Sequence, residues 1–430
     1  MPDRLKSLDV LRGLNMFFLT VFTAWMVEFC YLVPGLDWLQ PQWHHNPFGS
    51  TTLTLHDWIM PLFLFCSGTA IPFAFAKYEA QGRTKAQMYW RILRRVAALW
   101  FLGMICQGNL LKYDFAQLKW FSNTLQSIAV GYAFSAIFYM NFKPRTQVII
   151  AGALLLAYWA LMMFVRTRDG FGGGDFGQHN LCEWVDRTVL GRHCDHATLN
   201  PDGSYYFKKA GYTWLLSSLN FIVTVMTGTF AGEILKGGKG SGRGAEQGSG
   251  RRAAGAMTSV APSTLAETPV TPSTLGETPI APSTPGDAPA APTGTSPRKA
   301  LTLIGLGAAM FAAGKLWGLQ MPVNKYIWTS TMTLVTSGIG FMLLGVIYWI
   351  VDCRKWRGLD WLLPFGLNAI FIYFIGFICD FHTITKHLVD GLKPLISNPH
   401  WFGLIRCTVH GLLVWGLLYL MMKKKIFLRV

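Results

Sequence analysis

The stretch Gln147–Val165 reads QVIIAGALLLAYWALMMFV and contains no charged residue. As a helix it is long enough to cross a hydrocarbon core of ~30 Å. Similar apolar runs recur along the chain, whose 430 residues are 51% hydrophobic and only 14% charged. This composition is typical of a membrane protein and differs from that of an ordinary soluble domain.

The recurring runs predict an all-α, polytopic membrane protein of about ten transmembrane helices. The predicted spans lie at roughly 14–34, 57–77, 92–111, 123–142, 147–165, 212–235, 300–318, 328–351, 361–379 and 403–422. A lipid bilayer is therefore the first partner that we expect.

The net charge of +16 is compatible with nucleic-acid binding, but the placement of the charges argues against it. If the N-terminus is inside, 25 of the 38 Lys and Arg residues fall in cytoplasmic segments and their flanks. This is the positive-inside bias, which predicts that both termini are cytoplasmic. The start of the chain, MPDRLK, has no small-residue cleavage site, so we expect no removable signal peptide.

Two interruptions divide the predicted spans. Residues 166–211 form an external loop that contains DGFGGGD and is long enough to be a lid or binding element. Residues 237–299 are rich in Pro, Ser, Thr and Gly and contain three related decads, which predicts a disordered cytoplasmic linker. The chain is thus divided into 1–236, with about six helices, the linker 237–299, and 300–430, with about four.

The eight cysteines show no metal-ligand spacing, so we expect no metal. Cys182 and Cys194 share the external loop and can pair in an oxidising compartment. Spacing alone leaves that pairing open, because a disulfide depends on three-dimensional geometry.

The segment Trp43–Gly68, WHHNPFGSTTLTLHDWIMPLFLFCSG, is the strongest candidate for a site. Titratable groups at the edge of a membrane span are costly unless they face a cavity or a partner. His44 or His45 is suited to proton transfer near neutral pH. Asp57 can act as a helix cap, and it can also orient a histidine ring. His56 is beside Asp57 in sequence, so we expect it to point away from the same cavity.

Polar residues recur near the predicted external ends of other spans. Each of them alone is explained by a hydrogen bond between helices. Together with His45 and Asp57 they suggest a polar cavity in the external half, with these substrate-binding candidates: Asn123, Gln126, Asn220, Asn324, Lys325 and Ser330. Gly228 and Gly232 form a GxxxG pattern, which predicts close helix packing.

Arginines mark the predicted cytoplasmic ends of two spans. Arg12 lies three residues after Asp9, a spacing that predicts an ion pair on a helix. Arg94 and Arg95 begin the third span, where topology alone explains them. Guanidinium groups also bind phosphates, so Arg12, Arg94 and Arg95, with Asn368 nearer the cytoplasmic side, are candidates for binding a phosphorylated cofactor.

Several segments together resemble the heparan-alpha-glucosaminide N-acetyltransferase family, including its bacterial NagX-like branch. The similar stretches, in order, are RLKSLDVLRG, LTLHDWIMPLFLFCSG, TLQSIAVGY, SSLNFIVTVMTGTFAGEIL, PVNKYIWTS, PFGLNAIFIY and KKKIF. The resemblance implies transfer of acetyl from acetyl-CoA to the amino group of an amino sugar or glycan, on the non-cytoplasmic side. It also implies an integral protein of a bacterial inner membrane.

The resemblance places the active-site histidine shortly before Asp57. The spacing here is longer, with Pro47–Thr52 as a small insertion, so His44 and His45 both remain candidates. We favour His45, because Phe48 then stands where the family has an aromatic residue. The family's asparagine in the first span corresponds to Thr23 here, which is a departure from its pattern.

The leading hypothesis is a membrane acyltransferase in which His45 acts as base or acetyl carrier and Asp57 orients it. The alternative is a transporter of sugars or lipid-linked glycans that performs no chemistry. A third is a scaffold whose linker recruits partners. The sequence allows a homo-oligomer and does not give the acceptor.

Overall fold

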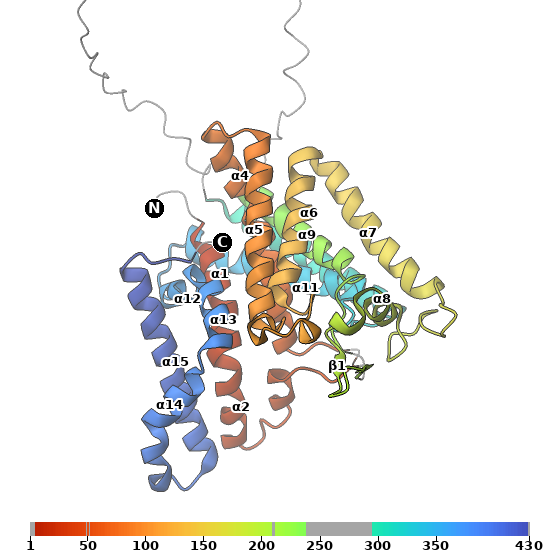
Figure 1. Cartoon of the computed structure of the whole chain (residues 1–430). Coiled ribbons are helices and arrows are strands. Elements are labelled where there is room, and N and C mark those ends of the chain that lie inside the picture. Colours follow the sequence, from red (N-terminus) through yellow and green to blue (C-terminus); the bar gives the residue numbers. More distant parts are fainter. Residues whose placement is uncertain (1–4, 49, 51, 209–210, 238–294, 429–430) are drawn as a thin grey trace, which may run out of the picture.

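The computed structural model describes the chain apart from residues 1–4, 49, 51, 209–210, 238–294 and 429–430. Most of the predicted linker therefore lies outside the described residues. The described part is a bundle of helices with one small two-stranded sheet (Figure 1). This arrangement confirms the predicted all-α class.

The helices follow the chain in the order in which the apolar runs appear. Their bounds are α1 Lys6–Phe17, α2 Thr23–Leu32, α3 Ile59–Thr69, α4 Ile71–Ala80, α5 Lys85–Cys106, α6 Thr124–Asn141, α7 Pro144–Phe164, α8 Leu181–Leu190, α9 Ser218–Lys236, α10 Pro297–Trp317, α11 Ser330–Tyr348, α12 Leu363–Leu367, α13 Ala369–Ile378, α14 Phe381–Val389 and α15 Pro399–Lys423. The strands are β1 Ala197–Leu199 and β2 Tyr205–Phe207, which pair antiparallel.

Each of the ten predicted spans corresponds to a helix or to a run of consecutive helices. Within the described residues, seven of these are long and apolar enough to cross a membrane, and an eighth is formed if α12 and α13 are one span, bent by 63°. The remaining two are α5 and α6, which pack side by side in the bundle (Figure 1). The first half of α5 carries four cationic residues, which explains its lower apolarity: Lys85, Arg91, Arg94 and Arg95.

The centre of the bundle depends on glycines that let helices approach closely. A Cβ added at Gly228 of α9 would lie 2.0 Å from the Phe65 carbonyl oxygen of α3. At Gly232 it would lie 2.5 Å from the Thr69 carbonyl oxygen. The GxxxG pattern therefore marks the α3–α9 contact, as the sequence predicted. α1 meets α12 in the same way, because a Cβ at Gly366 would lie 1.9 Å from the Asp9 carbonyl oxygen.

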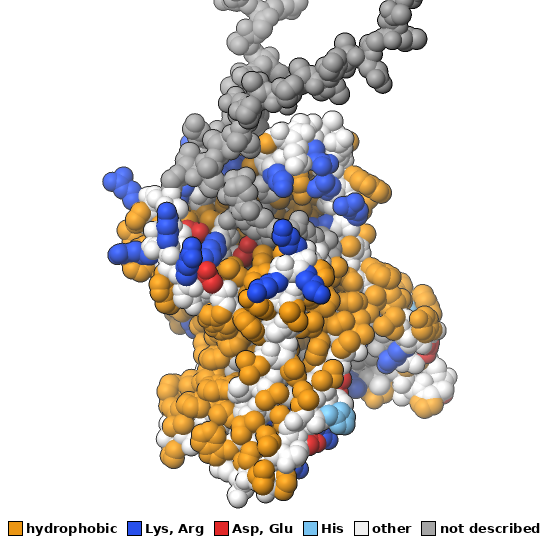
Figure 2. All heavy atoms as spheres, turned by 90° about the vertical axis from the view of Figure 1, so that its left-hand side faces the viewer, with side chains coloured by type: hydrophobic (Ala, Val, Ile, Leu, Met, Phe, Trp, Pro, Cys, Tyr) orange, Lys and Arg blue, Asp and Glu red, His pale blue; other side chains and the backbone are white. Residues whose placement is uncertain are grey.

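The two ends of the bundle differ in charge. Figure 2 shows Lys and Arg side chains gathered around one end, above a broad hydrophobic belt. The beginning of α1 lies at this end, whereas α14 and the end of α2 lie at the opposite end (Figure 1). This gathering of Lys and Arg at one end agrees with the uneven distribution of these residues among the segments between the predicted spans.

The loop 166–211 is a folded unit, with α8 at its centre. Glu183 of α8 pairs with Arg187 at 2.7 Å and with His196 at 3.0 Å. Cys182 and Cys194 are both buried free thiols in this structure, so they do not form the disulfide that the sequence left open. Cys182 lies 3.1 Å from the Tyr158 hydroxyl, which holds it against α7.

Asp186 fastens this unit to the bundle. Its carboxylate accepts hydrogen bonds from the Trp214 and Leu215 backbone N–H groups at 2.7 and 3.0 Å. Burial raises the pKa of Asp186 to about 7. Burial lowers the pKa of His196, but the carboxylates of Glu183, Asp195 and Asp186 together raise it by more, so the net shift is upward.

We expect the unit around α8 to be more stable in mild acid. Between pH 3.8 and about 7 the folded state holds a proton on Asp186 that the unfolded chain has released, so stability falls as pH rises through this window. The stabilisation by protonated His196 is also lost as pH rises through its raised pKa. Hydrogen exchange of α8 amides, corrected for intrinsic rates, should show more protection at pH 5.5 than at 7.5. Equal protection at both pH values would contradict this expectation.

Candidate active site

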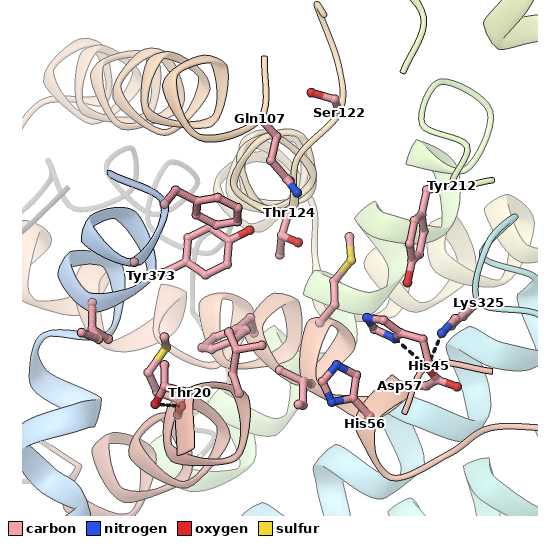
Figure 3. Close-up of a pocket in the computed structure, with 18 of the residues that line it drawn as sticks. Thr20, His45, His56, Asp57, Gln107, Ser122, Thr124, Tyr212, Lys325 and Tyr373 are labelled. Atoms are coloured by element: carbon pink, nitrogen blue, oxygen red, sulfur yellow. Dashed lines mark hydrogen bonds and ion pairs between the residues drawn. The ribbon is translucent and has the colours of Figure 1, made fainter. Parts of the chain in front are cut away.

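Asp57 is the centre of a group of three polar side chains, shown with dashed contacts in Figure 3. It lies in a short 3-10 turn, His56–Trp58, directly before α3. Its Oδ1 is 3.1 Å from His45 Nδ1 and 2.5 Å from Lys325 Nζ. Its Oδ2 accepts a hydrogen bond from the Thr54 backbone N–H at 3.1 Å. An ionised Asp57 can only accept, so His45 Nδ1 is the donor in their contact.

The loop that carries His45 is held from both sides. Thr54 Oγ1 donates to the His44 carbonyl at 2.8 Å, which closes the loop on itself. The Tyr326 hydroxyl donates to the Asn46 carbonyl at 2.6 Å, and the Phe48 and Tyr326 rings lie 5.2 Å apart. Tyr326 is the residue after Lys325, so the same turn positions the lysine and the histidine loop.

Lys325 balances the charge of Asp57. The lysine side chain is only 4% exposed, and that of Asp57 is fully buried. Burial lowers the pKa of Lys325 and the Asp57 carboxylate raises it less, so the net shift is downward. A buried charge is tolerated when it is paired, and this pair satisfies both groups. Lys325 therefore neutralises the charge of Asp57 at its contact with His45.

His45 faces a cavity of about 490 Å³. Its side chain is 54% exposed, so the ring edge opposite Asp57 is open. Tyr212 lies on the same side and points toward the three residues, whereas Tyr373 and Thr20 lie across the cavity (Figure 3). The volume is in the range of small-molecule sites.

His56 lines the same cavity, contrary to the expectation from its place beside Asp57. Its ring lies edge-to-face with that of His45, with centroids 4.2 Å apart. The expectation was wrong because His56–Trp58 is a 3-10 helix, in which neighbouring side chains do not have to point to opposite sides.

His44 belongs to a different cavity. That cavity has a volume of about 240 Å³ and is also lined by Glu28 and Arg406. The ring of His44 lies 3.5 Å from the Gln40 side chain. The structure therefore brings His45, and not His44, to Asp57.

Among the six substrate-binding candidates, only Lys325 lines the 490 Å³ cavity. The side chains of the other five bond to backbone groups. Asn123 caps α6 through the Leu125 N–H, Gln126 bonds Ser122 and Trp120, Asn220 donates to the Trp328 carbonyl, Asn324 accepts from the Tyr326 N–H, and Ser330 donates to the Leu155 carbonyl. Several of them support the turns that carry the cavity walls.

The candidates for phosphate binding do not line this cavity and lie on the side of the chain's Lys- and Arg-rich end. Arg12 Nη1 is 3.7 Å from Asp9 Oδ1, as the helical spacing predicted, and Nη2 donates to the Cys66 carbonyl at 3.2 Å. Arg95 lies over the Tyr132 ring at 4.1 Å, and Arg94 is exposed. Asn368 is buried at the break between α12 and α13, and within the described structure its side-chain amide has no hydrogen-bond partner.

The first predicted span contains a π-helical segment, Phe18–Phe22, between α1 and α2. Thr23 directs its hydroxyl to the Phe18 carbonyl at 2.7 Å and does not belong to the cavity wall, whereas Thr20 does. Segments of this kind are frequent at functional sites because they change which side chains face inward.

Sequence reasoning missed several residues of the cavity wall. They come from several loops and helices rather than from one motif: His56, Asp195, Tyr212, Gln107, Thr124 and Tyr373. Asp195 and Tyr212 carried a weak signal, since both lie in or beside the long external loop. His56 also carried a signal, as a histidine of the segment Trp43–Gly68, whereas Gln107, Thr124 and Tyr373 are ordinary residues of apolar runs and had none.

The fold and the site define a polytopic membrane protein with a buried Asp–Lys pair and a histidine that opens into an internal cavity. No family model matches the chain. Over its full length it is 22% identical to the human heparan-alpha-glucosaminide N-acetyltransferase and 21% identical to the mouse protein of the same name. The chain spans about three fifths of the length of these relatives. The comparison confirms the resemblance to the heparan-alpha-glucosaminide N-acetyltransferase family that the motifs indicated.

Proposed function

We propose that the protein is a membrane acyltransferase that moves acetyl from acetyl-CoA to the amino group of an amino sugar or glycan. The observation that carries this proposal is His45, which contacts the buried Asp57 on one edge and is open to the cavity on the other. The names of the human and mouse relatives support the reaction class.

In the proposed reaction the acceptor nitrogen attacks the thioester carbonyl carbon. His45 Nε2 takes the proton that the nitrogen loses, while Asp57 holds Nδ1 and stabilises the imidazolium that forms. The carbon–sulfur bond then breaks, and the CoA sulfur leaves with the electron pair and takes up a proton. The Tyr212 hydroxyl points toward this group and can donate to the developing oxyanion (Figure 3). Burial raises the pKa of Tyr212, which keeps that donor protonated.

The acetyl donor would reach this point from the Lys- and Arg-rich end, which the positive-inside bias makes cytoplasmic. Arg12 lies one helical turn before Met16, and Asn368 one turn before Ile372, and both Met16 and Ile372 line the cavity. The unpartnered amide of Asn368 and the guanidinium of Arg12 would thus continue the wall of the cavity toward that end. In this proposal the acetyl group is transferred at the external face and both termini are inside, which the positive-inside bias of the charges supports.

Alanine substitution of each histidine tests the proposal. His45→Ala should lower acetyl transfer from labelled acetyl-CoA to glucosamine by about 10²-fold or more, since general-base catalysis contributes 10²–10⁴-fold. His44→Ala is the matched control, because its ring lines the separate cavity, and it should retain nearly full activity. His56→Ala should have an intermediate effect, because its ring packs on that of His45. Full activity in His45→Ala would exclude this histidine as the base.

A transporter of sugars or glycans is the second candidate. The break of 63° between α12 and α13 favours it, since discontinuous helices often border transport sites. A transporter would move labelled glucosamine across proteoliposomes without releasing CoA. Release of CoA that depends on the acceptor would favour the acyltransferase.

A further inference from the structure

The cavity contains a second carboxylate, Asp195, that the proposed reaction does not use. It lies in the external unit, between the buried residues Cys194 and His196. His196 is turned away and paired with Glu183 at 3.0 Å. Asp195 is half-buried on the cavity wall, in the turn directly before β1.

The backbone that carries Asp195 is fixed on both sides. Trp120 N–H donates to the His193 carbonyl at 3.2 Å, and Cys194 forms an isolated bridge with Phe121. Lys119 Nζ donates to the Ala197 carbonyl at 2.5 Å. These contacts tie the segment to the loop before α6, so the position of Asp195 is set by the bundle. A rigid position of this kind suits a group that binds a ligand.

The acidic side chains of the cavity wall differ in their hydrogen-bond partners and in the charges beside them. Asp57 is satisfied by His45, Lys325 and the Thr54 N–H. Asp380 caps α14 by accepting from the His382 and Thr383 N–H groups. The neighbours that stabilise the charge of Asp195 are the His196 ring, the Trp214 indole and the Lys119 ammonium, yet burial raises its pKa by more. Asp195 is not engaged by an ion pair or as a helix cap among the described residues, so its carboxylate can accept hydrogen bonds from a ligand.

Aromatic rings connect Asp195 with the reacting histidine. Trp214 is beside Asp195, its ring lies 6.0 Å from that of Tyr212, and the Tyr212 ring lies 6.5 Å from that of His45. The wall between the two polar groups is therefore aromatic. Pyranose rings bind through their C–H faces to aromatic rings and through their hydroxyls to carboxylates, so such a wall has the two elements that a sugar requires.

We propose that Asp195 and Tyr212 form the subsite for the acceptor sugar, with Asp195 accepting hydrogen bonds from ring hydroxyls while the amino group faces His45. This inference rests on the proposed acetyl transfer and names the part of the acceptor that is recognised. It makes the external unit, and not only the membrane-spanning bundle, a determinant of specificity. Asp195 acts here by binding substrate and takes no part in the proton transfer.

Steady-state kinetics with two acceptors test the subsite in the full-length protein. Asp195→Asn should raise KM for glucosamine about tenfold or more, as expected for loss of hydrogen bonds to a charged acceptor group, with kcat changed little. KM for n-propylamine, which has no hydroxyl, should not change. Asp202→Asn is the control, because Asp202 lies exposed in the same external unit and outside the cavity wall.

Calorimetric titration with glucosamine gives a readout that does not require turnover. Asp195→Asn should weaken binding of glucosamine by a similar factor, and Asp202→Asn should not. An unchanged KM and an unchanged affinity would overturn the subsite. Equal losses for both amines would also overturn it, since they would indicate a general structural role. If the wild type binds glucosamine but transfers acetyl to neither amine, the proposed reaction fails while the binding result still decides the role of Asp195.

Discussion

Asp57→Asn is expected to reduce acetyl transfer by about 10³-fold or more and to destabilise the protein by about 3–5 kcal/mol. The uncharged amide no longer stabilises the imidazolium of His45, and it leaves the Lys325 ammonium buried without a counter-charge. The two effects have one cause, because the same Oδ1 atom contacts both partners. Initial rates with saturating acetyl-CoA and the midpoint of thermal unfolding measure them separately.

The double variant Asp57→Asn/Lys325→Met separates the two roles. It removes the buried charge together with its partner, so much of the lost stability should return. Activity should remain low, since His45 still lacks its carboxylate. If the double variant recovered activity as well, Asp57 would serve only to neutralise Lys325. If Asp57→Asn kept wild-type stability, the ion pair would be less buried than the structure shows.

Gly228→Ala is expected to destabilise the protein by about 3 kcal/mol or more, which is at the upper end of the effects of overpacking a core. The new Cβ would lie 2.0 Å from the Phe65 carbonyl oxygen, which is backbone and cannot move without shifting α3. Because α3 follows directly after Asp57, this shift should also weaken the site. The yield of monodisperse protein in detergent and its thermal midpoint are the measurements.

Gly152→Ala is the matched control. Gly152 lies inside α7, and a Cβ there would meet nothing within 4 Å. Alanine is favoured over glycine in an exposed helix interior by roughly 0.5–1 kcal/mol, so this variant should be as stable as the wild type or slightly more. Replacing glycine by alanine is thus expected to lower the stability of the protein at position 228 and to maintain or slightly raise it at position 152. Similar stability of both variants would mean that α3 and α9 are not in close contact.

The sequence predicted the features that depend on local pattern. Apolar runs of span length predicted the helices, and the GxxxG pattern of α9 predicted a close contact. The three-residue spacing of Asp9 and Arg12 predicted their ion pair. Each of these follows from helical geometry within one segment, so no knowledge of distant partners was needed.

The composition of the cavity could not be predicted in the same way. Asn123 and Ser330 have the polarity of ligand-binding residues, yet the Asn123 side chain caps α6 and the Ser330 hydroxyl donates to a backbone carbonyl of α7. Asp195 contributes to the wall because a loop far along the chain folds back toward α6. Whether a polar side chain forms its hydrogen bonds with backbone groups or remains available to a ligand depends on tertiary contacts, and a single sequence does not show these contacts.

The ion pair of Asp57 and Lys325 also joins the two parts of the chain that the linker separates. Asp57 precedes residues 237–299 and Lys325 follows them, so neither part contains a complete pair. Each part alone would carry an unbalanced charge beside an apolar helix, which is costly in a membrane. The pair is therefore satisfied only when both parts have come together. The site is therefore complete only in the fully assembled bundle. An incompletely assembled bundle would carry the charge of Asp57 or of Lys325 without its partner.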